Sequence, residues 1–348
     1  MRKFDYLFLK DSALPTSLVG TAIGLGRLAE RMDLRISEHP EVFEELERNA
    51  RFLSVKGSNA IEGIRTSDDR LSSLIDRTVE PSGHDEQEIA GYRDALAIIH
   101  GNRNRQIIDE KIILDLHRVM MSYTPEGGGR YKESDNLIIG IDAEGRKYVH
   151  FRPLSAEETP SAMEQLTLAY IDAEQSGVEP LLLIPCFILD FLSIHPFSDG
   201  NGRVSRLLTL LLLYRHGYDV GRYMSFEERI DNTKGRYYRC LSESSRDWHE
   251  GKNDYVPFIT YYLGVLSDCY IGLDRCFATV EGKKATKNNR IEAVIMNSLV
   301  PISKREIMSA LPDVSQRTVE LCLHKMVSEG SVERIGGNRN ARYRKKRQ

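Results

Sequence analysis

Apolar residues recur at intervals of three and four along most of the chain, which is the period of helices with one buried face. This pattern predicts helices at residues 40–52, 92–100 and 109–121. Residues 181–194 and 207–213 are apolar on nearly every side, as in helices surrounded by other helices. We therefore expect a mainly α-helical bundle with these two segments at its centre.

One segment in the middle of the chain departs from the helical period. Residues 137–141 and 147–151 are rich in β-prone side chains, and the turn-forming sequence Asp-Ala-Glu-Gly separates them. Two such runs around a short polar turn predict a β-hairpin within residues 136–152.

A second structural unit is predicted at the C-terminal end. Residues 281–289 are polar, which is typical of a linker. Three short helical patterns follow, and residues 331–344 then alternate around Gly-Gly-Asn as in a second hairpin. Three helices and a hairpin in so short a span indicate a small winged helix-turn-helix. The helical patterns cover residues 290–299, 304–310 and 316–329.

These patterns divide the 348 residues into three expected parts. Residues 1–105 would form an N-terminal helical region, residues 106–280 a catalytic core with the hairpin, and residues 284–348 the winged-helix-like domain. Residues 283–348 carry 15 Lys and Arg against 6 Asp and Glu, a balance of +9, whereas the whole chain has a net charge of −3. The remainder therefore carries −12, and a basic unit on an acidic body indicates a separate function for that unit.

The basic unit fits nucleic acid as one partner. Residues 316–325 would be the recognition helix, and Arg339, Arg342 and Arg344 would follow the phosphates. Many winged helices bind proteins instead, so DNA binding through residues 284–348 and binding of a protein both remain open.

Cysteine usage and hydropathy indicate where the protein works. The five cysteines form no CxxC pair and are odd in number, which fits a reducing compartment. The first apolar stretch is broken by Asp5, Lys10 and Asp11, unlike a signal peptide. Residues 181–194 are too short to span a bilayer. We expect a cytoplasmic protein without membrane association.

The sequence HPFSDGNGRVSR, which begins at His195, carries the densest set of reactive side chains. Gly200 and Gly202 allow backbone N–H groups to converge on an anion, and the following helix adds its positive N-terminal end. Arg203 and Arg206 are three residues apart, so both project from one helical face toward the same place.

Two arginines beside such a loop suit a polyphosphate, since each guanidinium binds oxygens in a fork. Asp199 is the only carboxylate of the cluster and is the expected Mg²⁺ ligand. His195 has an ordinary pKa that suits proton transfer near neutral pH. The remaining histidines show no metal-ligand spacing.

This segment resembles the Fic family, because it matches the family pattern HPFx[DE]GNGRxxR at every fixed position. The resemblance implies a protein adenylyltransferase that moves AMP from ATP to Ser, Thr or Tyr hydroxyls of target proteins. It assigns His195 as general base, Phe197 as the anchor of the loop, and Asp199 as the Mg²⁺ ligand. It also implies that Asn201 contacts the α-phosphate, that Arg203 supports the β-phosphate and that Arg206 grips the γ-phosphate. The implied ATP-binding residues are Glu62, His195, Gly200, Asn201, Gly202, Arg203, Val204, Ser205, Arg206, Tyr237 and Tyr238.

Two further parts of the chain fit the same family. The hairpin would be the flap that aligns a target peptide by edge pairing, with Leu137, Ile138, Ile139 and Gly140 nearest the nucleotide. Tyr237 and Tyr238 resemble the aromatic pair on the adenine side. Ser245 stands where the family often has Asn.

The sequence SNAIEG, from Ser58 to Gly63, resembles the inhibitory motif of the family. The resemblance implies that Glu62 pairs with Arg206 in the place of the γ-phosphate, and that Ser58 joins the same network. The alternative is a capping box that opens a helix.

Three other activities compete with adenylylation. Related kinases of this superfamily transfer a terminal phosphate, but they replace the second motif glycine, which is kept here as Gly202. Removal of AMP at the same site, with Glu62 positioning water, and a nucleotide-sensing DNA-binding regulator also remain open. The resemblance further allows self-modification and a homodimer.

Overall fold

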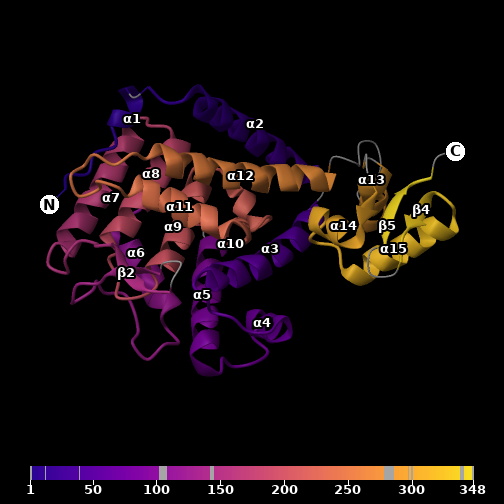
Figure 1. Ribbon diagram of the computed structural model, residues 1–348, viewed down its shortest axis with the longest axis horizontal. Helices are drawn as coiled ribbons and strands as arrows, with labels where there is room; N and C mark the ends of the chain where they lie inside the picture. Colours follow the sequence, from indigo (N-terminus) through magenta and orange to yellow (C-terminus); the bar gives the residue numbers. More distant parts are fainter. Residues whose placement is uncertain are drawn as a thin grey trace.

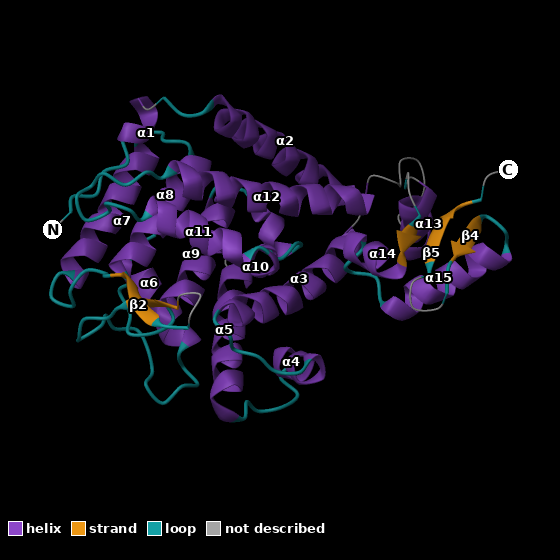
Figure 2. Ribbon diagram, in the orientation of Figure 1, coloured by secondary structure: helices purple, strands orange, loops and turns teal. Residues whose placement is uncertain are grey.

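The computed structural model describes residues 2–11, 13–38, 40–101, 108–141, 145–277, 286–296, 298, 301–337 and 341–346. The protein is mainly helical, as predicted (Figures 1 and 2). The helices of the larger body are α1 (Phe8–Asp11), α2 (Thr16–Glu38), α3 (Pro40–Ile61), α4 (Asp68–Ile75), α5 (Gly83–Gly101), α6 (Glu110–Met120), α7 (Thr159–Gln175), α8 (Pro180–Ile194), α9 (Asn201–Arg215), the short 3-10 helix η1 (Asp219–Arg222), α10 (Phe226–Asn232), α11 (Lys234–Ser244) and α12 (Val256–Phe277).

Helices α8 and α9 form the centre of the body. Every side chain from Leu181 to Ile194 is buried, because α7, α9 and α12 cover this helix on different sides. A single hydrophobic core extends from Phe4 in the N-terminal segment to Cys276 near the end of α12. The expected N-terminal region and catalytic core therefore share one core.

Helix α3 differs from its predicted length. The helical pattern predicted residues 40–52, whereas the helix continues to Ile61 and includes Ser58 in its last turn. A capping box needs its serine before the first turn of a helix. The capping-box interpretation of Ser58 is therefore wrong.

The predicted hairpin is present, as strands β1 (Ile138–Ile141) and β2 (Lys147–Phe151). The strands are antiparallel, and Gly140 lies opposite Tyr148. Leu137, which was expected in the strand, lies just before it. Most of the predicted turn, residues 142–144, lies outside the described residues.

The C-terminal unit has its own hydrophobic core, formed by residues from Ile291 to Val332. The predicted helices are present, and β3 joins the hairpin in an antiparallel sheet of order β3-β5-β4, which the sequence did not predict. Lys287 was expected in the linker but begins a helix, and residues 281–285 and Arg339 lie outside the described residues. The elements are α13 (Lys287–Met296), β3 (Ile302–Ser303), α14 (Lys304–Ala310), α15 (Gln316–Ser328), β4 (Val332–Ile335) and β5 (Arg342–Lys345).

The C-terminal unit lies beside one end of α12 and α3, and the β1–β2 hairpin lies toward the opposite end of the molecule (Figure 1). Arg290 is buried and donates to both carboxylate oxygens of Asp313 and to the Cys276 carbonyl at the end of α12. Lys287 forms an ion pair with Glu45 of α3 at 2.7 Å. Within the described residues, α12 alone is long and apolar enough to cross a membrane, but it packs against α2, α8 and α11 in the bundle.

Candidate active site

The candidate loop connects the two central helices. Helix α8 ends at Ile194 because His195 adopts a left-handed conformation with φ 53° and the next residue is Pro196, which has no N–H to donate. Helix α9 begins after Gly200, whose φ is 80° and where a β-carbon would lie 2.5 Å from Met120 Cε. Only glycine fits that position without strain.

The loop is fixed by side chains within the motif itself. The Asn201 Oδ1 accepts from the Phe197 N–H at 2.9 Å, and the Asn201 Nδ2 donates to the Phe197 carbonyl at 2.7 Å. Phe197 is buried and stacks on His117 of α6, with ring centroids 3.7 Å apart. Phe197 thus anchors the loop, and the Asn201 amide is engaged by the loop backbone rather than directed at a ligand.

Lys132 holds the loop from outside the motif and was not singled out in the sequence. Its Nζ donates to the Ile194 carbonyl at 3.1 Å, and its backbone N–H donates to the Pro196 carbonyl at 2.9 Å. Asn136 accepts from the same ammonium and donates to the Phe197 carbonyl. Burial lowers the pKa of Lys132 to about 8. No local pattern marks such a residue, because its partners are backbone carbonyls more than sixty positions away.

His195 lines a cavity beside the loop and has one ring nitrogen available to a ligand. The Nδ1 lies 3.2 Å from the Leu192 carbonyl, which can only accept a hydrogen bond, so Nδ1 carries the proton and Nε2 presents a lone pair. Burial lowers the pKa of His195 to about 4. The imidazole is therefore neutral near pH 7, which is the form that a general base requires.

Arg206 binds two residues from the end of α3. Its Nε donates to the Ser58 hydroxyl at 2.8 Å, and its Nη2 donates to the Ser58 carbonyl at 2.9 Å and to Glu62 Oε1 at 2.8 Å. The Arg206 side chain is 3% exposed and the Glu62 side chain 33% exposed. The structure thus brings together the three predicted inhibitory residues. Of the paired side chains, Glu62 is the more exposed and can move away from Arg206.

Glu62 also lies against the backbone of the loop. A β-carbon built on Gly202 would lie 2.4 Å from Glu62 Oε1, so the carboxylate fills the space beside this glycine. Lys234 of α11 donates to the Ile61 carbonyl and holds the preceding residue in place. A negatively charged oxygen therefore already occupies the position where an anion would meet the loop.

Arg203 is buried and paired with a residue that the sequence did not indicate. Its Nη2 donates to Glu88 Oε1 at 2.8 Å and to Asp199 Oδ2 at 3.0 Å. Its Nε and Nη1 are buried and have no hydrogen-bond partner among the described residues. Buried donors without partners are costly, so these two N–H groups fit an acceptor-rich ligand such as a phosphate.

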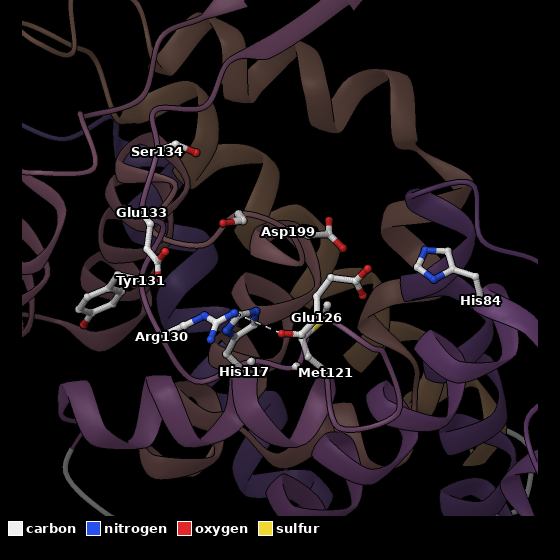
Figure 3. Close-up of a pocket in the computed structure, with 12 residues that line it drawn as sticks. His84, His117, Met121, Glu126, Arg130, Tyr131, Glu133, Ser134 and Asp199 are labelled. Carbon is white, nitrogen blue, oxygen red and sulfur yellow. Dashed lines mark hydrogen bonds between the residues drawn. The ribbon is translucent and has the colours of Figure 1, made fainter.

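Asp199 lies at the rim of the loop, with its side chain 64% exposed. A cavity of about 530 Å³ adjoins it, and Figure 3 shows Asp199 and Glu126 in this cavity between His84 on one side and Glu133 on the other. The described residues contain no group of three or more His, Cys, Asp or Glu placed to hold a metal ion. A metal here would take phosphate oxygens and water as further ligands, which fits Mg²⁺.

A larger cavity of about 760 Å³ lies between the loop, the β1–β2 hairpin and α11. His195, Gly202, Arg206 and Glu62 are among its lining residues. A third cavity shares His195, Gly202 and Glu62 with it and is also lined by Gly200, Asn201 and Arg203. The sequence predicted several of the remaining lining residues, namely Ile138, Ile139, Gly140, Tyr237 and Tyr238, and noted Ser245. It missed lining residues from β2, α8, α11 and the turn after α11, namely Tyr148, His150, Phe151, Leu192, Ser193, Leu241, Ser242 and Arg246.

Three residues expected at the nucleotide do not line the described cavities with their side chains. Leu137 precedes the strand and is exposed. Val204 is buried in the hydrophobic core. Ser205 is buried, and its hydroxyl donates to the Gly202 carbonyl at 2.7 Å. For Val204 and Ser205 the reason is helical geometry, because both side chains point away from the face of α9 that carries Arg203 and Arg206.

Comparison with known proteins places this arrangement in a family. The family model described as Fic/DOC matches residues 107–213. The protein adenylyltransferase Fic of Nematostella vectensis is 23% identical over 220 residues, which cover 62% of this chain and 46% of that protein. The protein of the same name from Culex quinquefasciatus is 28% identical over 202 residues, which cover 55% of this chain and 38% of that protein. The chain thus spans less than half the length of these curated relatives.

Solved structures share the fold. A Fic family protein from Desulfovibrio desulfuricans G20 superposes with a TM-score of 0.63 at 22% identity, covering 97% of this chain and 98% of that one. Fic-1 from C. elegans superposes with a TM-score of 0.58 at 20% identity, covering 74% and 73%. The motif match and the family model agree that residues 107–213 form a Fic/DOC family domain, and the solved structures share the fold of the chain.

Proposed function

We propose that this protein is an adenylyltransferase that transfers AMP from ATP to a hydroxyl of a target protein. The target oxygen forms a bond to the α-phosphorus, the bond from the α-phosphorus to the bridging oxygen breaks, and pyrophosphate leaves. His195 Nε2 takes the hydroxyl proton. Mg²⁺, held by Asp199, would neutralise phosphate charge.

One observation carries the proposal: a base, an open glycine backbone and an arginine meet in a single cavity. His195 presents an unprotonated nitrogen, and Arg206 supplies a fixed cation in the same cavity. Gly202 has no side chain, so the space beside it would admit phosphate oxygens once the Glu62 carboxylate leaves. A nucleophile accepted from the flap side would meet a phosphate held by the loop. Positioning and charge stabilisation of this kind account for most of the catalysis in phosphoryl and nucleotidyl transfer.

The same geometry supports autoinhibition by Glu62. Its carboxylate occupies the space beside Gly202 and binds the arginine that would hold the γ-phosphate. ATP can then bind productively only after this carboxylate moves away. The ground state of the protein would therefore be inactive.

The test is a labelling assay with ATP and a lysate or candidate targets, read by intact mass and peptide identification. The Glu62→Gly variant should add the mass of AMP, and the further change His195→Ala should lower the rate about 10²–10⁴-fold, which is the usual contribution of a general base. ATP affinity should stay within about threefold, because the loop and the arginines hold the phosphates. His324→Ala, on exposed α15, is the matched control and should label normally. Full labelling by His195→Ala would refute the role of His195.

A second activity at this site is removal of AMP from a modified protein. Glu62 favours it, because a partly exposed carboxylate at the phosphate end of the cavity can orient a water molecule. A pre-modified target incubated with wild-type protein and Mg²⁺ tests this reaction. Loss of AMP in wild type but not in Glu62→Gly would assign the glutamate to hydrolysis, whereas a stable product would leave inhibition as its role.

A further inference from the structure

Besides Glu62, a second carboxylate is connected to Arg206 through neighbouring side chains. Glu227, in the first turn of α10, is fully buried. Its Oε1 accepts from the Tyr92 hydroxyl at 3.0 Å, and its Oε2 accepts from the Ser225 hydroxyl at 3.3 Å. No Lys or Arg nitrogen among the described residues lies within ion-pair distance of it.

Tyr92 of α5 links this carboxylate to Arg206. Its hydroxyl interacts with the Ser58 hydroxyl, which accepts from Arg206 Nε at 2.8 Å. Burial and the Glu227 charge raise the pKa of Tyr92 well above its ordinary value, so its proton stays on the hydroxyl and is donated to Glu227.

The donors and acceptors of this chain are consistent in one direction only. A guanidinium can only donate and a carboxylate can only accept, so Arg206 donates to Ser58 and Tyr92 donates to Glu227. With both ends fixed in this way, a hydrogen bond between the two hydroxyls would be donated by Ser58. In that arrangement each hydroxyl would accept one hydrogen bond and donate one. A chain aligned in this way is strengthened by the polarisation of each bond by the next.

Close packing of α3 on α10 makes these contacts stable. A β-carbon on Gly57 would lie 2.8 Å from the Glu228 nitrogen, so the two backbones touch at this glycine. One turn earlier on α3, the Ser54 hydroxyl donates to the Ser225 hydroxyl at 3.0 Å. Glu227 is therefore held from α3 through two serines, Ser54 and Ser58, that lie four residues apart.

A fully buried carboxylate without a direct cation is costly to keep. The compensation that the chain offers is the Arg206 charge, reached through two hydroxyls. Glu62 is the direct and partly exposed partner of Arg206, whereas Glu227 is an indirect and buried partner that cannot leave. When Glu62 moves away from Arg206, the interaction with Glu227 would therefore remain.

We propose that Tyr92 and Glu227 are positioning residues that hold Arg206 in its phosphate-facing orientation through Ser58, so that the guanidinium stays in place when Glu62 moves away. The inference rests on the proposed function only for the identity of the phosphate ligand. Without this second carboxylate, release of Glu62 would leave Arg206 free to turn toward solvent or another acid.

The nucleotide test uses the full chain in the Glu62→Gly background. ATP and ADP affinities are measured by calorimetry for Tyr92→Phe and Glu227→Gln, which remove one hydrogen bond or one charge with little change of volume. We expect ATP affinity to fall about tenfold and ADP affinity less than about twofold, because Arg206 faces the γ-phosphate in the proposed function. Tyr170→Phe is the matched control, since Tyr170 is equally buried and its hydroxyl bonds to His216, outside the site. Equal losses for ATP and ADP, or a loss in Tyr170→Phe of the same size, would overturn the proposal.

A second measurement needs no nucleotide and so separates this proposal from the proposed function. Hydrogen exchange of the Arg206 Nε proton is followed by NMR on ¹⁵N-arginine-labelled protein, with the signal assigned by its loss in Arg206→Lys. Exchange should be at least about tenfold faster in Tyr92→Phe, Glu227→Gln and Ser58→Ala than in Tyr170→Phe. Faster exchange in a protein that fails to bind ATP would retain the positioning role and reject the nucleotide function. Unchanged exchange in the folded variants would reject the positioning role itself, and Ser58→Ala decides the outcome if either of the other two fails to fold.

Discussion

The Glu62 carboxylate occupies the space beside Gly202 that a side chain at position 202 would need. The Glu62 Oε1 would lie 2.4 Å from a β-carbon on Gly202, and the same oxygen binds Arg206 at 2.8 Å. In the proposed autoinhibition, the carboxylate would block the loop by occupying space and by neutralising the cation. Both effects would have to end before a phosphate reached the loop.

Removal of this carboxylate should activate the protein. If the closed state is favoured by about 1.4–2.8 kcal/mol, Glu62→Gly should raise labelling of itself and of targets about ten- to hundredfold. The measurement compares initial rates at saturating ATP in wild type, Glu62→Gly and Arg206→Ala. Arg206→Ala should remain inactive, because it frees the glutamate but loses the phosphate contact. Equal rates in wild type and Glu62→Gly would contradict the inhibitory role of Glu62.

Asp199→Asn should raise the Mg²⁺ concentration for half-maximal labelling at least about tenfold, because the exposed carboxylate supplies the direct charge at this rim. The titration is done in the Glu62→Gly background at fixed ATP. Glu126→Gln, in the adjoining cavity, is the matched control and should leave the Mg²⁺ dependence nearly unchanged. A wild-type Mg²⁺ titration in Asp199→Asn would show that the ion is held elsewhere.

Lys132→Met should weaken the loop without changing any residue of the motif. The substitution keeps the length of the side chain but removes the donors to Ile194 and Asn136. We expect a loss of about 1–3 kcal/mol in the free energy of unfolding, the usual cost of buried acceptors left without partners, and about tenfold slower labelling. Urea denaturation and the labelling assay test this. Lys111→Met removes an exposed lysine and should change neither measurement, and the same behaviour in Lys132→Met would be evidence against its role.

Stability should fall as the pH is lowered from about 6.5 toward 4. Burial lowers the pKa of His100 to about 3 and that of His117 and His195 to about 4. Each pKa lies below the value of an unfolded histidine, so the unfolded chain binds more protons in this range and acid favours it. We expect a loss of about 1–2 kcal/mol per buried histidine between pH 7 and pH 5. Urea unfolding at several pH values measures the slope, which should be smaller in His117→Gln than in His324→Gln; equal slopes would exclude His117 as a contributor.

DNA binding by the C-terminal unit remains a prediction with a simple test. Two of the expected phosphate contacts are already paired, Arg342 with Glu306 and Arg344 with Glu333. We therefore expect weak affinity for duplex DNA that falls steeply with salt. Mobility shifts at two salt concentrations, with Arg342→Ala beside Lys111→Ala in the larger body, measure it. Absence of binding at low salt would favour a protein partner for this unit.

The twelve residues from His195 to Arg206 could be predicted as a site because they are contiguous. Local backbone geometry places the base, the glycines and the arginines together whatever surrounds them, and the helical period likewise gave α8, α9 and α14. The end of α3 could not be found in this way. The polar residues that follow residue 52 interrupt the apolar pattern, whereas tertiary contacts with α10 and Arg206 carry the helix on to Ile61.

By itself, the sequence determined the family resemblance, the mainly helical class and the residues of the loop, since these depend on short-range spacing and on side-chain chemistry. Tertiary structure alone decided which distant residues serve that loop: Lys132 on its backbone, Glu88 on Arg203, and Glu227 behind Arg206 through Tyr92. These partners are buried polar groups from separate helices. Each satisfies a donor or a charge that would otherwise be left unpaired inside the bundle, and that requirement exists only after the helices have packed.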